Sequence, residues 1–253
     1  MDVKEVTDIA MVSGEILLTN GSETYRVEDT IERICSAYDI KSECFVTPTG
    51  IFLSCWSKSN PKDSVSIVKR IKSRTINLHK IEMINTFSRS LEDKKVAYDE
   101  AMKILEDLNS APYFPYYKRL FAAGITSFAY AMLFSGTVIN GVVAALISML
   151  IYYSKNRVTN ISLLPFFSDF IWSFITGILA ILISKYILPI NIDSVIIGSI
   201  IVLFPGIAIT NGIRDALYGD ILSSQVRLTE ALYTVTAIGV GVGISLLLMK
   251  IWM

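Results

Sequence analysis

The chain has 253 residues, of which 52% are hydrophobic, and its 23 basic and 23 acidic residues give a formal net charge of zero at pH 7. The charges are unevenly distributed, because 35 of the 46 lie in the first 119 positions and the stretch from Leu120 to Ser154 has none. A hydrocarbon core about 30 Å thick requires roughly 20 apolar residues per helix. The composition therefore excludes an ordinary soluble protein and predicts a water-soluble first half followed by a membrane half.

The first residues of the chain predict a helix rather than a signal peptide, since they include acidic side chains and no apolar run before a cleavage site. Apolar residues at helical spacing predict an amphipathic helix over 3–19. Asn20-Gly21 is expected to end it, because both residue types tolerate the left-handed conformation common at helix ends. Ser22 or Thr24 is expected to cap a second helix, whose apolar stripe covers 27–37.

The hydrophobic period then changes to the alternation typical of strands. Residues 43–47 and 51–56 flank Pro48-Thr49-Gly50, which predicts a β-hairpin. With Thr49-Gly50 at the centre of the turn, Cys44 is expected to face Cys55 across the two strands. The remaining predicted elements of this half are a strand at 65–71 and helices at 78–90 and 91–109.

Catalytic signals in the first half are weak. His79 is the one histidine of the chain, so a Ser-His-Asp or Cys-His site would have to use it, and it is expected at a surface or between domains. Cys35, Cys44 and Cys55 lack C-x-x-C spacing and are expected to be reduced core residues. A zinc site would need all three together with His79, at spacings wider than structural zinc sites use. We therefore expect no enzyme, no metal and no cofactor.

The second half predicts a membrane domain over 118–253, preceded by a small cytoplasmic α+β domain over 1–117. The fold class is an α-helical polytopic membrane protein with five transmembrane helices. The five predicted spans are about 119–134, 138–154, 163–184, 195–211 and 231–249. The first two are short, which leaves a re-entrant pair as the alternative for them.

Lys and Arg in the short loops predict the orientation. Six of these residues fall on the side of the N-terminal domain and two on the other side. The six are Lys118, Arg119, Lys155, Arg157, Arg214 and Arg227, and the two are Lys185 and Lys250. The N-terminus is therefore expected in the cytoplasm and the C-terminus outside a multi-pass plasma membrane protein, as an odd number of spans requires.

Ionisable residues within spans are costly and tend to line pathways. Asp169 lies about a third of the way into the third span. Three interpretations stay open for it: a residue of a transport pathway, a hydrated carboxylate near the interface, and a member of a structural ion pair.

The fourth span contains Pro205-Gly206, which predicts a kinked or broken helix. Broken helices at membrane depth are tolerated where they line a cavity or are buried in protein. The polar residues that follow the break and complete the predicted pathway or coupling site are Thr210, Asn211, Arg214, Asp215 and Asp220. The alternative is a cytoplasmic connector, in which Arg227 and Glu230 simply pair.

A second polar segment stands at the start of the predicted second helix. Its residues are Asn20, Gly21, Glu23, Arg26 and Glu28. Glu23 and Arg26 are three positions apart and can pair on a helix. The segment is either a solvated helix start or a binding or regulatory motif.

These two polar blocks, the Pro48-Thr49-Gly50 hairpin and the order of the spans resemble the threonine/serine exporter family over almost the whole chain. The resemblance implies export of threonine, serine or, in split relatives, a dicarboxylate such as succinate across the plasma membrane. It also implies that the chain is similar to the larger subunit of a two-component form, whose partner is a smaller membrane protein of the same family.

We therefore expect a subunit of a secondary exporter that moves a small polar metabolite. The expected partners are that metabolite, the smaller membrane subunit and the lipid bilayer, with a homo-oligomer left open and no nucleic acid. A membrane-anchored cytoplasmic enzyme resembling a hydrolase is the alternative function, and a signalling or scaffold protein anchored by its spans is a third.

Overall fold

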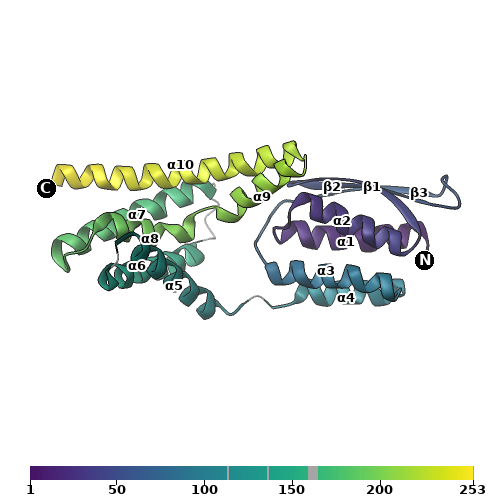
Figure 1. Ribbon diagram of the computed structural model, residues 1–253, viewed down its shortest axis with the longest axis horizontal. Helices are drawn as coiled ribbons and strands as arrows, with labels where there is room; N and C mark the ends of the chain where they lie inside the picture. Colours follow the sequence, from purple (N-terminus) through teal and green to yellow (C-terminus); the bar gives the residue numbers. More distant parts are fainter. Residues whose placement is uncertain (113, 136, 159–164, 253) are drawn as a thin grey trace. The chain divides into compact units, whose positions relative to one another are not determined.

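The computed structural model describes residues 1–112, 114–135, 137–158 and 165–252, and it divides into two compact units (Figure 1). Unit 1 comprises Met1–Tyr113 and Ala208–Leu228, and unit 2 comprises Phe114–Ile207 and Thr229–Met253. The division expected at residue 117 places 208–228 in the membrane domain. The structure instead packs this segment with the N-terminal residues, because its polar side chains find their partners there.

The first part of unit 1 is a small α+β fold. Its elements are α1 (Val3–Thr19), α2 (Thr24–Ala37), β1 (Ile40–Thr47), β2 (Gly50–Ser57), β3 (Ser64–Arg70), α3 (Leu78–Asp93) and α4 (Tyr98–Ser110). Figure 1 shows α1 and α2 between the sheet and the α3–α4 pair. The α+β architecture, the third strand and both later helices agree with the sequence prediction, although the break between α3 and α4 falls at 94–97 rather than at residue 91.

Helix α1 is the centre of the core of unit 1. Asp2 begins it with a capping box, in which its carboxylate accepts a hydrogen bond from the Glu5 amide at 2.7 Å and the Glu5 carboxylate accepts one from the Asp2 amide at 3.0 Å. Its buried residues, among them Ile9, Leu17 and Leu18, lie on several faces of the helix, because α1 packs against α2, the sheet and α3–α4. A helix enclosed in this way forms only with its neighbours in place.

The sheet is an antiparallel meander in the order β1-β2-β3. Thr47 pairs with Gly50, so the turn is centred on Pro48-Thr49, and Cys44 faces Leu53. The predicted register, with Cys44 facing Cys55, is therefore wrong. Proline presets the backbone angle that turns require, which places Pro48 inside the turn and Gly50 in the strand.

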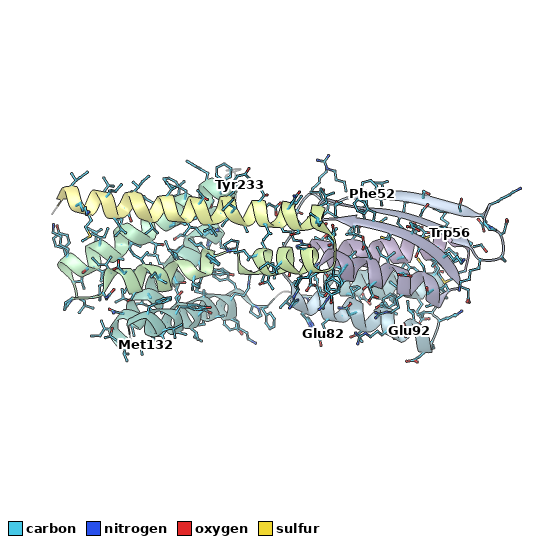
Figure 2. All side chains as sticks on the ribbon, turned by 45° about the horizontal axis from the view of Figure 1, so that its top comes forward. Phe52, Trp56, Glu82, Glu92, Met132 and Tyr233 are labelled. Atoms are coloured by element: carbon cyan, nitrogen blue, oxygen red, sulfur yellow. The ribbon has the colours of Figure 1, made fainter. Side chains whose placement is uncertain are left out.

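The two faces of the sheet differ in burial. Inward residues such as Val46, Ile51 and Leu53 are buried against the helices. On the outer face, Phe45, Phe52 and Val68 form a cross-strand row and remain about half exposed or more. Figure 2 shows Phe52 and Trp56 on this part of β2. Because the residue alternation is kept, the register error did not exchange the two faces.

The three cysteines are free thiols, as predicted. Cys35 and Cys55 are buried with their sulfur atoms 3.7 Å apart, while Cys44 is half-buried. Burial raises the pKa of Cys44 to about 12.

Unit 2 is built from helices of membrane-spanning character. The elements that follow α4 in the chain are α5 (Tyr116–Ser135), α6 (Val138–Val158), α7 (Pro165–Tyr186), α8 (Ile192–Ile200), the 3-10 turn η1 (Ile201–Leu203), α9 (Gly206–Leu217) and α10 (Ile221–Trp252). Most of α9 and the first turns of α10 belong to unit 1. Within the described residues, α6, α7 and α10 are each long and apolar enough to cross a membrane, and α8 to α9 is a bent pair that qualifies as a fourth span.

Five spans therefore remain a prediction. Helix α5 forms where the first span was expected, but it begins with two tyrosines followed by Lys118 and Arg119 and does not reach the apolar length of the others. The expected start of the third span at 163–164 lies outside the described residues. The last helix begins at Ile221, ten residues earlier than the predicted start at 231, because Asp220 provides a cap there.

The predicted break at Pro205-Gly206 is confirmed, and the bent pair has the form of a broken span or of a re-entrant loop. The chain leaves the 3-10 turn after Leu203, and the two helical segments meet at an angle of 62°. Pro205 has no backbone donor and fixes its own φ, so a straight helix cannot pass through it.

Candidate functional site

The candidate site in unit 1 begins where α1 ends. Asn20 is buried and donates from its side-chain amide to the Ile16 carbonyl at 2.7 Å. Gly21 follows with φ +91°, a left-handed conformation that favours glycine, and a Cβ there would lie 3.1 Å from the Thr75 carbonyl oxygen. The chain thus reverses sharply and presents the carbonyls of Gly21 and Ser22 to their neighbours.

The start of α2 differs from the prediction. Glu23 is the N-cap residue and no side chain caps the helix, so neither Ser22 nor Thr24 has the expected role. Thr24 instead donates to one oxygen of Asp215, from its hydroxyl at 2.9 Å and from its backbone amide at 3.3 Å. A buried carboxylate thereby takes the place of the missing cap, since it accepts an amide hydrogen that the helix itself cannot satisfy.

Asp215 on α9 is the centre of a buried polar network. Its second oxygen lies 2.9 Å from Nε of Arg227 on α10, and the two side chains are 0% and 6% exposed. Arg227 also donates to the Ser22 carbonyl at 2.8 Å, and Asn211 donates to the Gly21 carbonyl at 2.9 Å.

A second ion pair lies at the edge of this network. Glu23 is largely buried and contacts Arg214 of α9 at 2.5 Å and Arg26 of its own helix at 3.4 Å. The Glu23–Arg26 pair agrees with the prediction. Beside it, the rings of Tyr25 and Tyr218 stack at 3.9 Å. We call the residues of these contacts the Asp215 cluster: Gly21, Ser22, Glu23, Thr24, Asn211, Arg214, Asp215 and Arg227.

Glu28 and Asp220 lie beside the Asp215 cluster and have separate roles. Asp220 accepts a hydrogen bond from the Ser223 amide at 3.1 Å and so begins α10. Glu28 accepts one from the Val46 amide at 2.8 Å, and burial raises the pKa of its carboxyl above the usual value, opposed by that hydrogen bond. Glu28 thus ties α2 to the hairpin.

The Asp215 cluster pairs each of its charges with an opposite one. Glu23 contacts Arg214, and Asp215 contacts Arg227 and accepts from Thr24. Asn211 and Arg227 also donate to backbone carbonyls. Both members of the Asp215–Arg227 pair are buried, so a substrate could contact Asp215 only by separating the pair, which is costly. The cluster is therefore arranged to hold α9 and the start of α10 against the α1–α2 connection.

The other predicted pathway residues fall in different places. Thr210 is exposed on α9, and Pro205 and Gly206 form the break. Asp169 of α7 is buried in unit 2 and forms an ion pair with Lys155 of α6. Of the three interpretations of Asp169, the contact matches the ion pair.

The alternative of a catalytic site in the N-terminal fold would have to use His79. His79 is exposed on the surface of α3, where it lies 3.8 Å from Glu82. Among the described residues, no three His, Cys, Asp or Glu side chains gather at metal-binding distance.

Several site residues were missed by sequence reasoning. Thr24 is expected only as one of two possible caps, and Lys155 only as a loop charge. Arg227 is expected as a loop charge and, in the connector alternative, as the partner of Glu230. A cation close to the end of an apolar helix was the available signal for Lys155 and Arg227, since such a charge needs a partner.

Comparisons with known proteins agree with the membrane character of the chain. A family model described as "Putative threonine/serine exporter" matches residues 8–249. A protein of Mycobacterium tuberculosis named "Probable threonine/serine exporter" is 27% identical over 251 residues, which cover 97% of this chain and 46% of that protein. The chain thus spans about half the length of this curated relative. No solved structure matches it.

Proposed function

This chain belongs to the threonine/serine exporter family, and we propose that it is a subunit of a secondary exporter. It moves a small polar metabolite, either threonine and serine or a dicarboxylate such as succinate, out across the plasma membrane. The proposal extends to the orientation, with the N-terminus in the cytoplasm and the C-terminus outside. The name of the Mycobacterium tuberculosis relative supports the amino acids as substrates.

The observation that carries this proposal is the broken span. The bend of 62° between the α8 side and α9 lies in an otherwise apolar run, and the break occurs at Pro205. A helix interrupted at membrane depth leaves backbone amides and carbonyls without helical partners, and transporters use such groups to meet polar solutes. An anchor alone would have no need of the interruption.

The Asp215 cluster supports a role of the N-terminal fold in transport. It attaches the segment after the break to the α1–α2 connection through ion pairs and hydrogen bonds. Movement of α9 is therefore linked to the N-terminal fold. We propose that this fold controls the conformation of the broken span.

We also propose that a second membrane unit completes the pathway, supplied by a smaller membrane subunit. The relative of about twice the length supports this. A proton or charge gradient is the proposed energy source, because about 2.3 kcal/mol is available per charge for each 100 mV of membrane potential.

Efflux measurements test the proposal. Cells loaded with labelled threonine, serine or succinate are followed with this chain alone, with a smaller membrane protein of the same family alone, and with both. Efflux is expected only with both proteins. Efflux from the chain alone would refute the two-component form, and no efflux of any of the three compounds from cells with both would refute the exporter.

The broken span has its own test. Pro205→Ala with Gly206→Ala is expected to straighten the helix and to lower efflux at least about tenfold, while the protein still inserts. Gly243→Ala is the matched control, because a Cβ at Gly243 of α10 meets nothing within 4 Å. Unchanged efflux in the Pro205 variant would show that the break has no part in transport.

A further inference from the structure

A small cavity lies among the helices of unit 2, beside the Lys155–Asp169 ion pair. Its volume is about 150 Å³. Its polar lining comes from Ser148, Tyr152, Lys155 and Ser199, and its apolar lining includes Ile151 and Leu203. An apolar cavity of about this volume holds a benzene-sized molecule in another protein. The volume is therefore comparable with that of a small amino acid and too small for a large metabolite.

The polar groups of the cavity are held in place by packing. Ser148 and Ser199 are 1% and 2% exposed, and their hydroxyls donate to the carbonyls of Ala123 at 3.5 Å and Ala144 at 3.3 Å. A hydroxyl that donates in this way keeps its oxygen lone pairs as acceptors. The cavity thus offers two fixed acceptors for an ammonium or a hydroxyl, and the Lys155 ammonium for a carboxylate.

The ion pair decides which class of ligand fits. Lys155 lines the cavity and contacts Asp169, whose side chain is 10% exposed. A zwitterion adds no net charge beside the pair. Its carboxylate can contact Lys155, whose side chain is 38% exposed and keeps Asp169 as its partner, and its ammonium can contact the serine hydroxyls. A dicarboxylate instead brings a second negative charge next to Asp169, where burial makes an uncompensated charge costly.

We propose that this cavity binds a small zwitterionic amino acid. The α-carboxylate lies on the Lys155 ammonium, and the α-ammonium lies on the hydroxyls of Ser148 and Ser199. This inference rests on the proposed function and selects the amino acids over the dicarboxylate.

The place of the cavity in the chain agrees with loading from the cytoplasm. Lys155 is in the last turn of α6 and Asp169 is near the start of α7, and both ends lie on the proposed cytoplasmic side. Val202 and Leu203 in the wall belong to the 3-10 turn directly before the break at Pro205. A change at the break therefore alters the wall of the cavity.

Direct binding to the purified full chain in detergent tests the inference. The probes are radiolabelled L-threonine, L-serine and succinate, measured by equilibrium dialysis. Threonine and serine are expected to bind, and succinate at least about tenfold more weakly, as the loss of a charge-assisted hydrogen bond predicts. Failure of the wild type to bind either amino acid, or equal binding of succinate, would overturn the site.

Two variants separate the charges from the space. Lys155→Gln with Asp169→Asn is expected to weaken threonine binding at least about tenfold. Lys185→Gln, near the other end of α7, is the control and is expected to bind threonine as the wild type does. Val202→Phe reduces the cavity without removing a charge and is expected to cause a similar loss. If the double variant does not fold, Val202→Phe decides alone. If either folded variant binds threonine as tightly as the wild type does, the proposed site is wrong. Efflux from cells with the wild-type protein would in that case still support the proposed function.

Discussion

Asp215→Asn is expected to destabilise unit 1 by about 3–5 kcal/mol, the usual cost of removing one partner from a buried ion pair. Asparagine keeps the size of the side chain, and its carbonyl can still accept from Thr24. The Arg227 guanidinium, however, loses the carboxylate at 2.9 Å and stays buried with a neutral partner, the Ser22 carbonyl at 2.8 Å. The lost charge, rather than a lost contact, dominates the expected effect.

The matched control is Arg214→Gln. Arg214 also pairs with an acidic residue of the α1–α2 connection, Glu23, but its side chain is 48% exposed. Solvent screens such a pair, so the expected cost is below about 1 kcal/mol. The comparison separates burial of the charge from the mere presence of an ion pair.

Urea unfolding of the purified chain in detergent measures both variants. Replacing Trp172 and Trp252 by phenylalanine leaves Trp56 on β2 as the single tryptophan, which reports on unit 1. With a urea slope of about 1–3 kcal/mol per molar, Asp215→Asn is expected to lower the midpoint by at least about 1 M. A decrease no larger than that of Arg214→Gln would refute the assignment of Asp215 and Arg227 as a buried, mutually dependent pair.

Three further outcomes are expected from other parts of the chain. Gly198→Ala is expected to reduce the yield of monodisperse protein in size-exclusion chromatography. The new Cβ would lie 2.7 Å from the Ala131 Cβ and 2.9 Å from the Ala131 backbone nitrogen. Gly243→Ala, whose Cβ meets nothing within 4 Å, is expected to leave the yield unchanged. Burial raises the pKa of Glu28 above 4.5. Below that pH the Glu28 carboxyl is protonated in both the folded and the unfolded protein. Above it, only the folded protein bears the cost of burying the Glu28 charge. Glu28→Gln should therefore gain stability relative to wild type in urea titrations as the pH rises from 4 toward 7. The pKa of about 12 at Cys44 predicts alkylation by iodoacetamide at pH 8 at least about tenfold slower than that of a free cysteine, measured by mass spectrometry.

Local elements of unit 1 were predictable because each is encoded by neighbouring residues. The apolar period marked α1 and α2, and the Pro48-Thr49-Gly50 segment marked the hairpin. The register of that hairpin was wrong because three turn-forming residues in a row allow two turn centres, and only the pairing of the whole strands selects one. The end of α1 at Asn20-Gly21 was predictable from the two residue types alone.

The candidate site was predictable only in pieces. Both polar blocks were recognised, but Thr24 and Asp215 are separated by 191 positions, and nothing in either block shows that they meet. Thr24 was assigned to a cap for the same reason, since its true partner lies on α9. The cavity beside Lys155 is formed by side chains of α6 and α8–η1, and such a space depends on packing that residue spacing does not describe.

Because α10 is long, the activity of this protein is expected to depend on the thickness of the bilayer. Its 32 residues extend about 48 Å at 1.5 Å per residue, whereas the hydrocarbon core is about 30 Å thick. The helix is therefore longer than the hydrocarbon core, and its first turns belong to unit 1, where Arg227 pairs with Asp215. Hydrophobic mismatch costs fractions of a kcal/mol per Å and is relieved by tilting. Efflux in vesicles is therefore expected to depend on the acyl-chain length of the lipid.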